Sequence, residues 1–477
     1  MLKNFLRNKN VKDSILYTGG NYFFRISLLI SNLISSNILG PTITGVITYI
    51  NAIDQNLNIA YSTLRSSIER ETPKLNAEGN AKESDKFISS SFLMSYILFF
   101  IGSIYYFILY LTSNDEYIKI TCLFFIFINF LKALSDLLRI YHKSLSNFSS
   151  ITLTLFIVSL LQPLLVLYMV NEYLYVGFLW TRIILYGFSV ILFVILLRKY
   201  PKLTLDFDIG YFKKIFRKGL PIVIFGLVMT LLMTIDKFFI RTSLGDSMLG
   251  YYSIGALIFQ VLLVLPESLY GSYFPKFITY KGDQNEQIDK LSSIIRVIIL
   301  PAIFITWLFI PIFINNFLPK FSTGVLSAKI LILAVYFAAS YQMYYYEIIR
   351  LNKYRKLIIG SVILLIFSSV VYTLANYLLD TIEEYAFVNV LIFLLFSFLV
   401  ISIAMLEMGK SIKIIAKKLT SELLKITPLI PILIIDIYYS YSLKIEIIKF
   451  GIFTVSYLPI LLYSKKEIKT YFFKKTI

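Results

Sequence analysis

The sequence has 477 residues, of which 57% are hydrophobic and only 16% are charged, with a mean hydropathy of +0.75 and a net charge of +18. A soluble protein of this size could not bury so much apolar surface and still present a polar exterior. The single Cys122 excludes a disulfide framework or a cysteine zinc site, and the single His142, expected in a solvated loop, excludes a multi-histidine metal site. No phosphate-binding loop or zinc-ligand spacing occurs, so neither a metal nor another cofactor is predicted.

Apolar segments recur along the whole chain, each near the roughly 20 residues that cross a hydrocarbon core of about 30 Å. They predict an all-α integral membrane protein with 14 transmembrane helices and almost no soluble domain. The predicted spans are 15–38, 42–63, 88–111, 118–140, 150–170, 174–197, 219–240, 247–270, 291–315, 325–347, 357–379, 385–406, 427–442 and 447–463. The last two predicted spans are the shortest, so hydropathy defines this final pair of spans least well.

Basic residues fix the expected orientation. With a cytoplasmic N-terminus, 35 of the 46 lysines and arginines fall in segments on the inside. Five fall outside, namely Lys119, Arg241, Lys320, Lys444 and Lys449. This asymmetry follows the positive-inside rule and places both termini in the cytoplasm. The positive charge therefore indicates contact with anionic lipids on the cytoplasmic side, not with nucleic acid.

The two halves of the chain share a glycine pattern. Leu39-Gly40 followed by Gly45 matches Leu244-Gly245 followed by Gly250, at a constant spacing. Together with the topology, this predicts a parallel repeat of two six-helix lobes, residues 1–205 and 206–406. Residues 407–477 then hold two extra transmembrane helices and a basic cytoplasmic tail.

Three segments carry a family resemblance: RISLLISNLISSNILGPTITGVITYI, KGLPIVIFGLVMTLLMTIDKFFIRTSLGDSMLGYYSIGALI and LPESLYGSYFPKF. On these, the chain resembles the multidrug/oligosaccharidyl-lipid/polysaccharide (MOP) exporter superfamily over about residues 14–405, in particular O-antigen and capsule flippases of the Wzx type. The resemblance implies a MATE-like, V-shaped transporter with two lobes, which is not an enzyme. Its implied role is to move undecaprenyl-diphosphate-linked oligosaccharide from the inner to the outer leaflet of a bacterial plasma membrane by alternating access. Polysaccharide assembly proteins could be further partners.

Polar side chains inside the spans are the candidates for function, because an ionisable group there costs about 2.5–3.5 kcal/mol on insertion scales. The second span carries one polar face at spacings of four and three residues, made of Thr44, Thr48, Asn51, Gln55, Asn58 and Ser62, with Asp54 beside it. The resemblance implies that the first, second, seventh and eighth spans line a central cleft. The substrate-binding candidates are Asn21, Arg25, Asn32, Asn51, Asp54, Gln55, Asn58, Lys237 and Gln260. The gating or ion-coupling candidates are Lys132, Asp136, Asp236, Arg241 and Glu267.

Arg25 is the strongest single candidate, because it lies near the middle of the first span. A guanidinium matches the geometry of phosphate oxygens, so Arg25 could bind the substrate diphosphate, although a structural pair with Asp54 is the alternative. Lys132 and Asp136 have the spacing of an ion pair within one helix. Asp236 and Lys237 are adjacent and are therefore not expected to form a simple pair, but could serve as a gate or an interfacial anchor.

Arg182, Arg296 and Lys329 lie near span ends, where they are expected to extend toward the interface.

Two other functions remain open. A cation-coupled drug exporter of the same fold is disfavoured by the two extra spans and by Arg25. A membrane-embedded polysaccharide polymerase or glycosyltransferase is disfavoured by the short outer loops, which leave no room for a catalytic domain.

Overall fold

The computed structural model describes residues 9–145, 147–197, 208–279, 284–351, 353–439 and 443–473. Within these ranges the regular elements are α-helices and two short 3-10 helices, without a strand, which confirms the predicted all-α class. The chain divides into two compact units, Met1–Thr230 and Leu231–Ile477. The predicted lobe boundary at residue 205 lies outside the described residues and stays a prediction.

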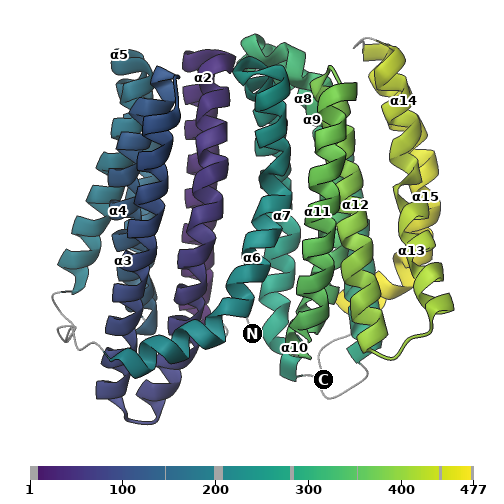
Figure 1. Ribbon diagram of the computed structural model, residues 1–477. Helices are drawn as coiled ribbons and strands as arrows, with labels where there is room; N and C mark the ends of the chain where they lie inside the picture. The colour runs from purple at the N-terminus through teal and green to yellow at the C-terminus, as the bar shows by residue number, and fades with distance from the viewer. Residues whose placement is uncertain are drawn as a thin grey trace. The chain divides into compact units, whose positions relative to one another are not determined.

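Four long helices form most of the first unit (Figure 1): α2 Lys9–Ala77, α3 Ala81–Thr112, α4 Glu116–Ser144 and α5 Phe148–Leu197. Two of them contain a break in the helical backbone, α2 at Gly40 (φ 79°) and α5 at Leu174 (φ 50°). Each of these two helices therefore supplies two of the predicted spans. The break in α5 also requires Gly177, because a Cβ at this position would overlap the backbone carbonyl of Met169.

The helix α6 Ile209–Leu244 leads from the first unit into the second. The second unit continues with α7 Asp246–Thr279, α8 Gln284–Phe317, the 3-10 helix η1 Pro319–Gly324, α9 Val325–Leu331, α10 Ala334–Arg350, α11 Tyr354–Leu378 and α12 Ile382–Glu407. The predicted span 325–347 is thus divided between α9 and α10. An irregular turn at 332–333, with hydrogen bonds such as Leu333 N to Ile330 O at 3.1 Å, separates the two helices.

In the structure, the thirteenth predicted span, 427–442, is preceded by a helix that continues into it. The helix α13 Ile412–Ile426 passes without a gap into the 3-10 helix η2 Thr427–Leu429 and then into α14 Ile430–Tyr438. Pro428 and Pro431 lack the N–H groups that a regular helix would need here, which explains the short 3-10 turn. Taken together, 412–438 is roughly 40 Å long, whereas α14 alone would reach only about 14 Å. The final helix, α15 Leu443–Phe473, packs against it.

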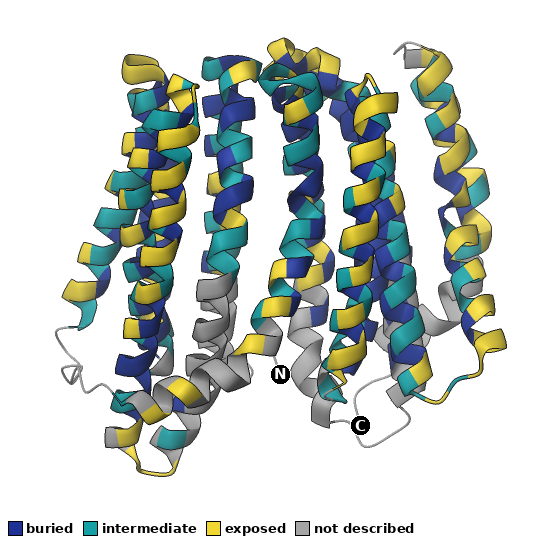
Figure 2. Cartoon of the chain, viewed as in Figure 1, coloured by how far each residue is buried: buried dark blue, intermediate teal, exposed yellow. Residues whose placement is uncertain are grey.

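Exposed apolar side chains cover the outside of the helices, as expected for contact with lipid (Figure 2). Ten helical segments in the described residues are long and apolar enough to cross a membrane. Two of them, Gly19–Ile59 and Phe148–Leu197, contain the breaks at Gly40 and Leu174 and count as two spans each. With the 412–438 stretch and α15, the chain is a multi-pass membrane protein with about 14 spans.

The glycine pattern that predicted the repeat has a conformational basis. Gly40 (φ 79°) and Gly245 (φ 86°) occupy equivalent positions in the two halves, and both adopt the left-handed conformation. Glycine enters this region without the steric cost that a Cβ imposes. Each half therefore has a glycine with positive φ between its first two spans.

Candidate functional site

An ion pair between two helices lies at the centre of the polar residues in the first unit. The Lys132 ammonium on α4 lies 2.7 Å from the Asp54 carboxylate on α2, and Asp54 is only 7% exposed. The Tyr106 hydroxyl of α3 also donates to Asp54, at 3.5 Å. The predicted pair between Lys132 and Asp136 is therefore wrong. The partner of Asp136 is Arg139, at 3.1 Å within the same helix.

This choice of partner has a simple electrostatic reason. Asp54 is buried between helices, where a carboxylate without a counterion would lose its hydration and gain nothing in return. Asp136 lies one turn below Lys132 and already has Arg139 within reach on a partly exposed face. Lys132 therefore pairs with Asp54, the carboxylate that would be more costly to leave unpaired.

A second cation of the first unit is held by an amide and two aromatic rings. Arg182 of α5 donates to the Asn51 side-chain oxygen at 2.9 Å. Its guanidinium carbon lies 4.6 Å from the ring centre of Phe178 and 5.4 Å from that of Phe125. Such rings stabilise a cation without neutralising it. Arg182 thus points into the unit, and the prediction that it extends toward the interface is wrong.

These contacts leave the first unit with an excess of positive charge at this point. Lys132 and Arg182 contribute two cations, and Asp54 contributes the one carboxylate. Asn51, which binds Arg182, lies about one helical turn from Asp54 on α2. Nothing in Asn51 neutralises Arg182, since an amide oxygen carries no net charge. The cluster Asn51–Asp54–Lys132–Arg182, called the N-unit cluster below, therefore favours an anion over a cation.

Several side chains on the polar face of the second span bond to the backbone of their own helix. Thr44, Thr48 and Asn58 each bond to the backbone carbonyl four residues earlier, at 2.7, 2.8 and 2.6 Å. These bonds satisfy the polar groups of Thr44, Thr48 and Asn58 within their own helix, so these side chains do not require contact with water. Gln55 is exposed, whereas the side chain of Ser62 lies outside the described residues.

The candidates on the first span lie on the surface of the first unit. Arg25 is exposed and follows directly on the half-buried Asn21–Phe24 turn, next to the exposed Ile26. Asn32 is half-buried, two turns further along. The Asp54 carboxylate, the alternative partner of Arg25, is paired with Lys132.

In the second unit, Asp236 is the centre of a buried network on α6. It is 2% exposed and accepts hydrogen bonds from the Tyr252 hydroxyl and the Asn389 amide, both at 2.6 Å. Lys237 lies 3.3 Å from the same carboxylate and also donates to the Met233 carbonyl at 2.8 Å. The expectation that these neighbours do not pair is wrong, because the long lysine stem folds back along its own helix.

Sequence reasoning missed both other partners of Asp236. Tyr252 is one of 36 tyrosines and has no distinguishing spacing. Asn389 was detectable as a polar residue in the otherwise apolar α12.

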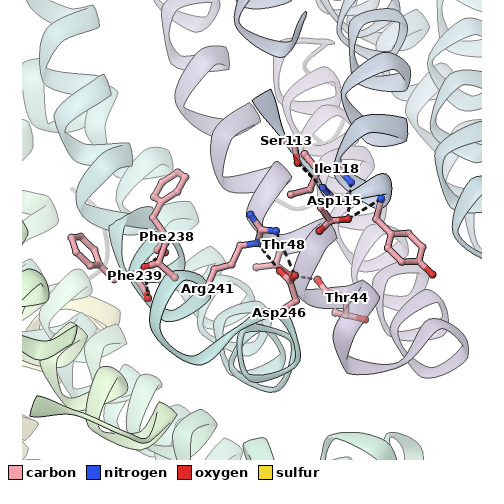
Figure 3. Close-up of polar contacts among 11 residues, drawn as sticks. Thr44, Thr48, Ser113, Asp115, Ile118, Phe238, Phe239, Arg241 and Asp246 are labelled. Carbon is pink, nitrogen blue, oxygen red and sulfur yellow. Dashed lines mark hydrogen bonds and ion pairs between the residues drawn. The ribbon is translucent and has the colours of Figure 1, made fainter. Parts of the chain in front are cut away.

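The turn between α6 and α7 is closed by a two-point ion pair. Arg241 Nε lies 2.6 Å from Asp246 Oδ1, and Arg241 Nη2 lies 3.4 Å from Oδ2 (Figure 3). Gly245 lies between them in its left-handed conformation. This geometry gives Arg241 a structural role at the turn. The remaining candidates, Gln260 and Glu267, are exposed on α7.

A further ionic cluster joins the last two helices to the rest of the second unit. Asp436 of α14 lies 2.7 Å from Lys329 and 2.6 Å from Lys449, and it accepts a bond from the Trp307 indole at 2.5 Å. Lys449 also pairs with Glu446 at 2.6 Å. Lys329 is 3% exposed, so its predicted extension to the interface is wrong.

His142 is also placed differently from the expectation of a solvated loop. It is fully buried near the end of α4, and its Nε2 lies 3.0 Å from the Phe193 carbonyl. Its Nδ1 lies 3.0 Å from the Asn147 amide, so both ring nitrogens have structural partners. No group of three or more His, Cys, Asp or Glu side chains that could hold a metal occurs among the described residues.

The comparisons with known proteins agree with this architecture. Residues 86–320, just under half of the chain, match a family described as "Polysaccharide biosynthesis protein". The lipid II flippase MurJ, in an inward closed conformation, is similar in structure with a TM-score of 0.70 and 13% identity, covering 95% of this chain and 100% of MurJ. An inward-facing multidrug resistance MATE family transporter of the MOP superfamily gives a TM-score of 0.68 at 14% identity, with 81% and 94% covered. A Vibrio cholerae MATE transporter gives 0.59 at 13%, with 83% and 96% covered.

No curated protein matches the chain in sequence. The chain is an all-α, multi-pass membrane protein whose fold is similar to those of MurJ and the MATE transporters. The match over residues 86–320 to a polysaccharide biosynthesis family is consistent with the resemblance that the sequence motifs carry.

Proposed function

We propose that the protein is a flippase that moves a lipid-linked oligosaccharide, carried on undecaprenyl diphosphate, from the inner to the outer leaflet by alternating access. The observation that carries this proposal is the positive excess of the N-unit cluster. A diphosphate diester has about two negative charges, and a site with one excess positive charge offsets part of the desolvation of those charges. The match to a polysaccharide biosynthesis family supports a glycan as the other half of the substrate.

Two arginines then have distinct roles. Arg25 is exposed, so it is available to a substrate phosphate, for which a planar guanidinium offers two parallel hydrogen bonds. Arg182 is held in place by Phe178 and Asn51, and it acts on the substrate through its uncompensated charge. The exposed glutamines Gln55 and Gln260, at equivalent positions of the two halves, are the proposed contacts for sugar hydroxyls.

The membrane potential would assist this reaction. With a negative cell interior, moving one negative charge outward is favoured by about 2.3 kcal/mol per 100 mV, so two charges gain roughly 4.6 kcal/mol. The substrate's own charge could thus contribute to driving the flip. No ATP-binding element is required.

A cation-coupled drug exporter is the second candidate, favoured by the likeness to MATE transporters. In that function Asp54 would have to receive the coupling cation. Lys132 already lies 2.7 Å from this carboxylate, so an incoming cation would have to displace a bound ammonium. The N-unit cluster therefore favours the flippase.

The deciding experiment follows a labelled polyprenyl-diphosphate sugar across proteoliposome membranes, with and without an imposed potential and without ion gradients. We expect a flip rate that rises with the potential, a loss of flipping in Arg25→Ala and partial activity in Arg25→Lys, where the charge survives but the fork does not. The matched control is Arg350→Lys, which should flip normally. Arg350 lies beyond the end of the predicted span 325–347 and is paired with Glu347. Wild-type flipping by Arg25→Ala, or flipping that requires a sodium or proton gradient, would contradict the proposal.

A further inference from the structure

The end of the second unit that the basic-residue pattern predicts to be cytoplasmic carries far more cations than its carboxylates can neutralise. The segments 347–356 and 407–425 contain nine basic residues and three acidic ones. All three carboxylates, those of Glu347, Glu407 and Glu422, are at most 9% exposed at their side chains.

Each of these carboxylates is already occupied. Glu347 pairs with Arg350 at 2.6 Å, and Glu407 holds Lys356 at 2.6 Å and Lys353 at 3.7 Å. Glu422 lies 3.9 Å from Lys418 and 3.8 Å from Lys425. Within the described part of this region, no ion pair is formed by the four remaining cations, Arg355, Lys410, Lys413 and Lys417.

Two of these cations lie one turn apart on the outer face of α13. The buried face of this helix consists of Ile415, Glu422 and Ile426, which fixes the opposite face as that of Lys413 and Lys417. Two like charges at this spacing disfavour the helix by a few tenths of a kcal/mol unless an anion lies between them. Both lysines are exposed.

The same part of α13 also exposes large apolar side chains. Ile412 is 79% exposed, and Leu424, on the same face as the two lysines and about two turns further along, is 63% exposed. A face that passes from lysines to leucine matches a partner with a negative head and an apolar body. The position of α13 is fixed from behind by Glu422, which accepts a hydrogen bond from the Tyr336 hydroxyl of α10 at 3.2 Å.

We propose that Lys413 and Lys417, with Lys410 three residues before them, form a binding site for the phosphate headgroup of an anionic phospholipid, whose acyl chains lie against Leu424. This site is separate from the N-unit cluster and does not depend on the substrate that the protein transports. It gives the thirteenth span a specific contact with the inner leaflet. Zwitterionic lipids would bind more weakly, because their ammonium group repels the same lysines.

The test uses the full-length protein in detergent, with bound lipids counted by native mass spectrometry during titration with phosphatidylglycerol or phosphatidylcholine. We expect a preference for phosphatidylglycerol that decreases as salt is added. In the double variant Lys413→Gln and Lys417→Gln the affinity for phosphatidylglycerol should fall roughly thirtyfold. The control variant Lys320→Gln and Lys444→Gln removes the same charge from two exposed lysines on the predicted outer side, and it should bind like the wild type.

Three outcomes would overturn the proposal: equal affinity for the two phospholipids, an unchanged affinity in the α13 variant, or an equal loss in the control. Competition with polyprenyl diphosphate separates the two sources of a lipid phosphate. If this lipid displaces phosphatidylglycerol and binds more tightly at Lys413 and Lys417, the site belongs to the transported substrate and the phospholipid assignment is wrong. If the protein does not flip the polyprenyl-diphosphate sugar in the proteoliposome assay, the proposed function is contradicted, but the measured phospholipid affinities are not affected.

Discussion

The ammonium of Lys132 lies 2.7 Å from the carboxylate of Asp54, across 78 positions of the sequence and between two different helices. Asp54 pairs directly with Lys132, whereas Arg182 is held by the uncharged Asn51, so the N-unit cluster has two cations and one carboxylate. Stability and function can therefore be separated by changing one member at a time.

Removal of Lys132 alone should destabilise the protein. Lys132→Met leaves Asp54 charged and buried, and we expect a loss of about 3 kcal/mol, at the lower end of the range for buried pairs because Lys132 keeps some exposure. The double change Lys132→Met with Asp54→Leu should recover most of it. Thermal unfolding in detergent gives the comparison, with Arg139→Met on the same helix as a control worth about 0.5 kcal/mol. Equal losses in Lys132→Met and Arg139→Met would mean that the pair is not buried in the membrane-inserted protein.

The positive excess of the N-unit cluster can be cancelled by a single, nearly isosteric change. Asn51→Asp places a carboxylate 2.9 Å from Arg182 and should form an ion pair without disturbing the packing. We expect an equal or higher melting temperature, together with a loss of at least tenfold in the flip rate. Asn316→Asp is the control, because Asn316 belongs to the second unit and its side chain bonds to the Ile312 carbonyl of its own helix. A normal flip rate in Asn51→Asp would show that the charge of the cluster is irrelevant to transport.

The hydropathy of the chain predicted most of the fold, since lipid imposes a long apolar run on every spanning helix. It did not predict the helix α13 that precedes the thirteenth span, because Lys413, Lys417 and Glu422 interrupt the apolar run there although the helix continues through them. The candidate site was harder, because helical spacing pairs Lys132 with Asp136 while only the packing of α2 against α4 brings Asp54 into reach. The roles of Arg25, Gln55 and Gln260 remain predictions.

The two repeat glycines should respond alike to the same substitution. Gly40→Ala and Gly245→Ala add a Cβ that meets no atom within 4 Å, so the whole cost comes from the positive-φ backbone and should be at least about 1–2 kcal/mol in each case. Gly187→Ala is the matched control, because its Cβ would meet only Leu131 at 3.8 Å in a helical backbone. This control should be neutral or stabilising by up to about 1 kcal/mol. Thermal unfolding measures all three, and a stable Gly245→Ala with an unstable Gly40→Ala would argue against equivalent turns.

The predicted orientation can be tested with single cysteines at two exposed positions, after Cys122 has been replaced by alanine. Asn114→Cys, in the turn between α3 and α4, should react with an impermeant thiol reagent in intact cells. Ser411→Cys, just before α13, should react only after the membrane has been opened. Mass spectrometry of the labelled protein provides the readout. Labelling of Ser411→Cys in sealed cells would reverse the topology and move the proposed phospholipid site to the other leaflet.

The turns at the predicted outer ends of the helices are very small. The connection at Gly245 is one residue long, and those at 113–115 and 379–381 are three residues long, while 318–324, which contains η1, is the longest fully described one with seven residues. An antibody of ordinary affinity covers about 800 Å², or some 20–30 residues, which no single turn of this kind can supply. Reagents raised to trap the protein in one state from outside the cell would therefore have to bind several helix ends at once. Such binders would recognise an arrangement of helices and not a peptide, so immunisation with synthetic loop peptides should fail.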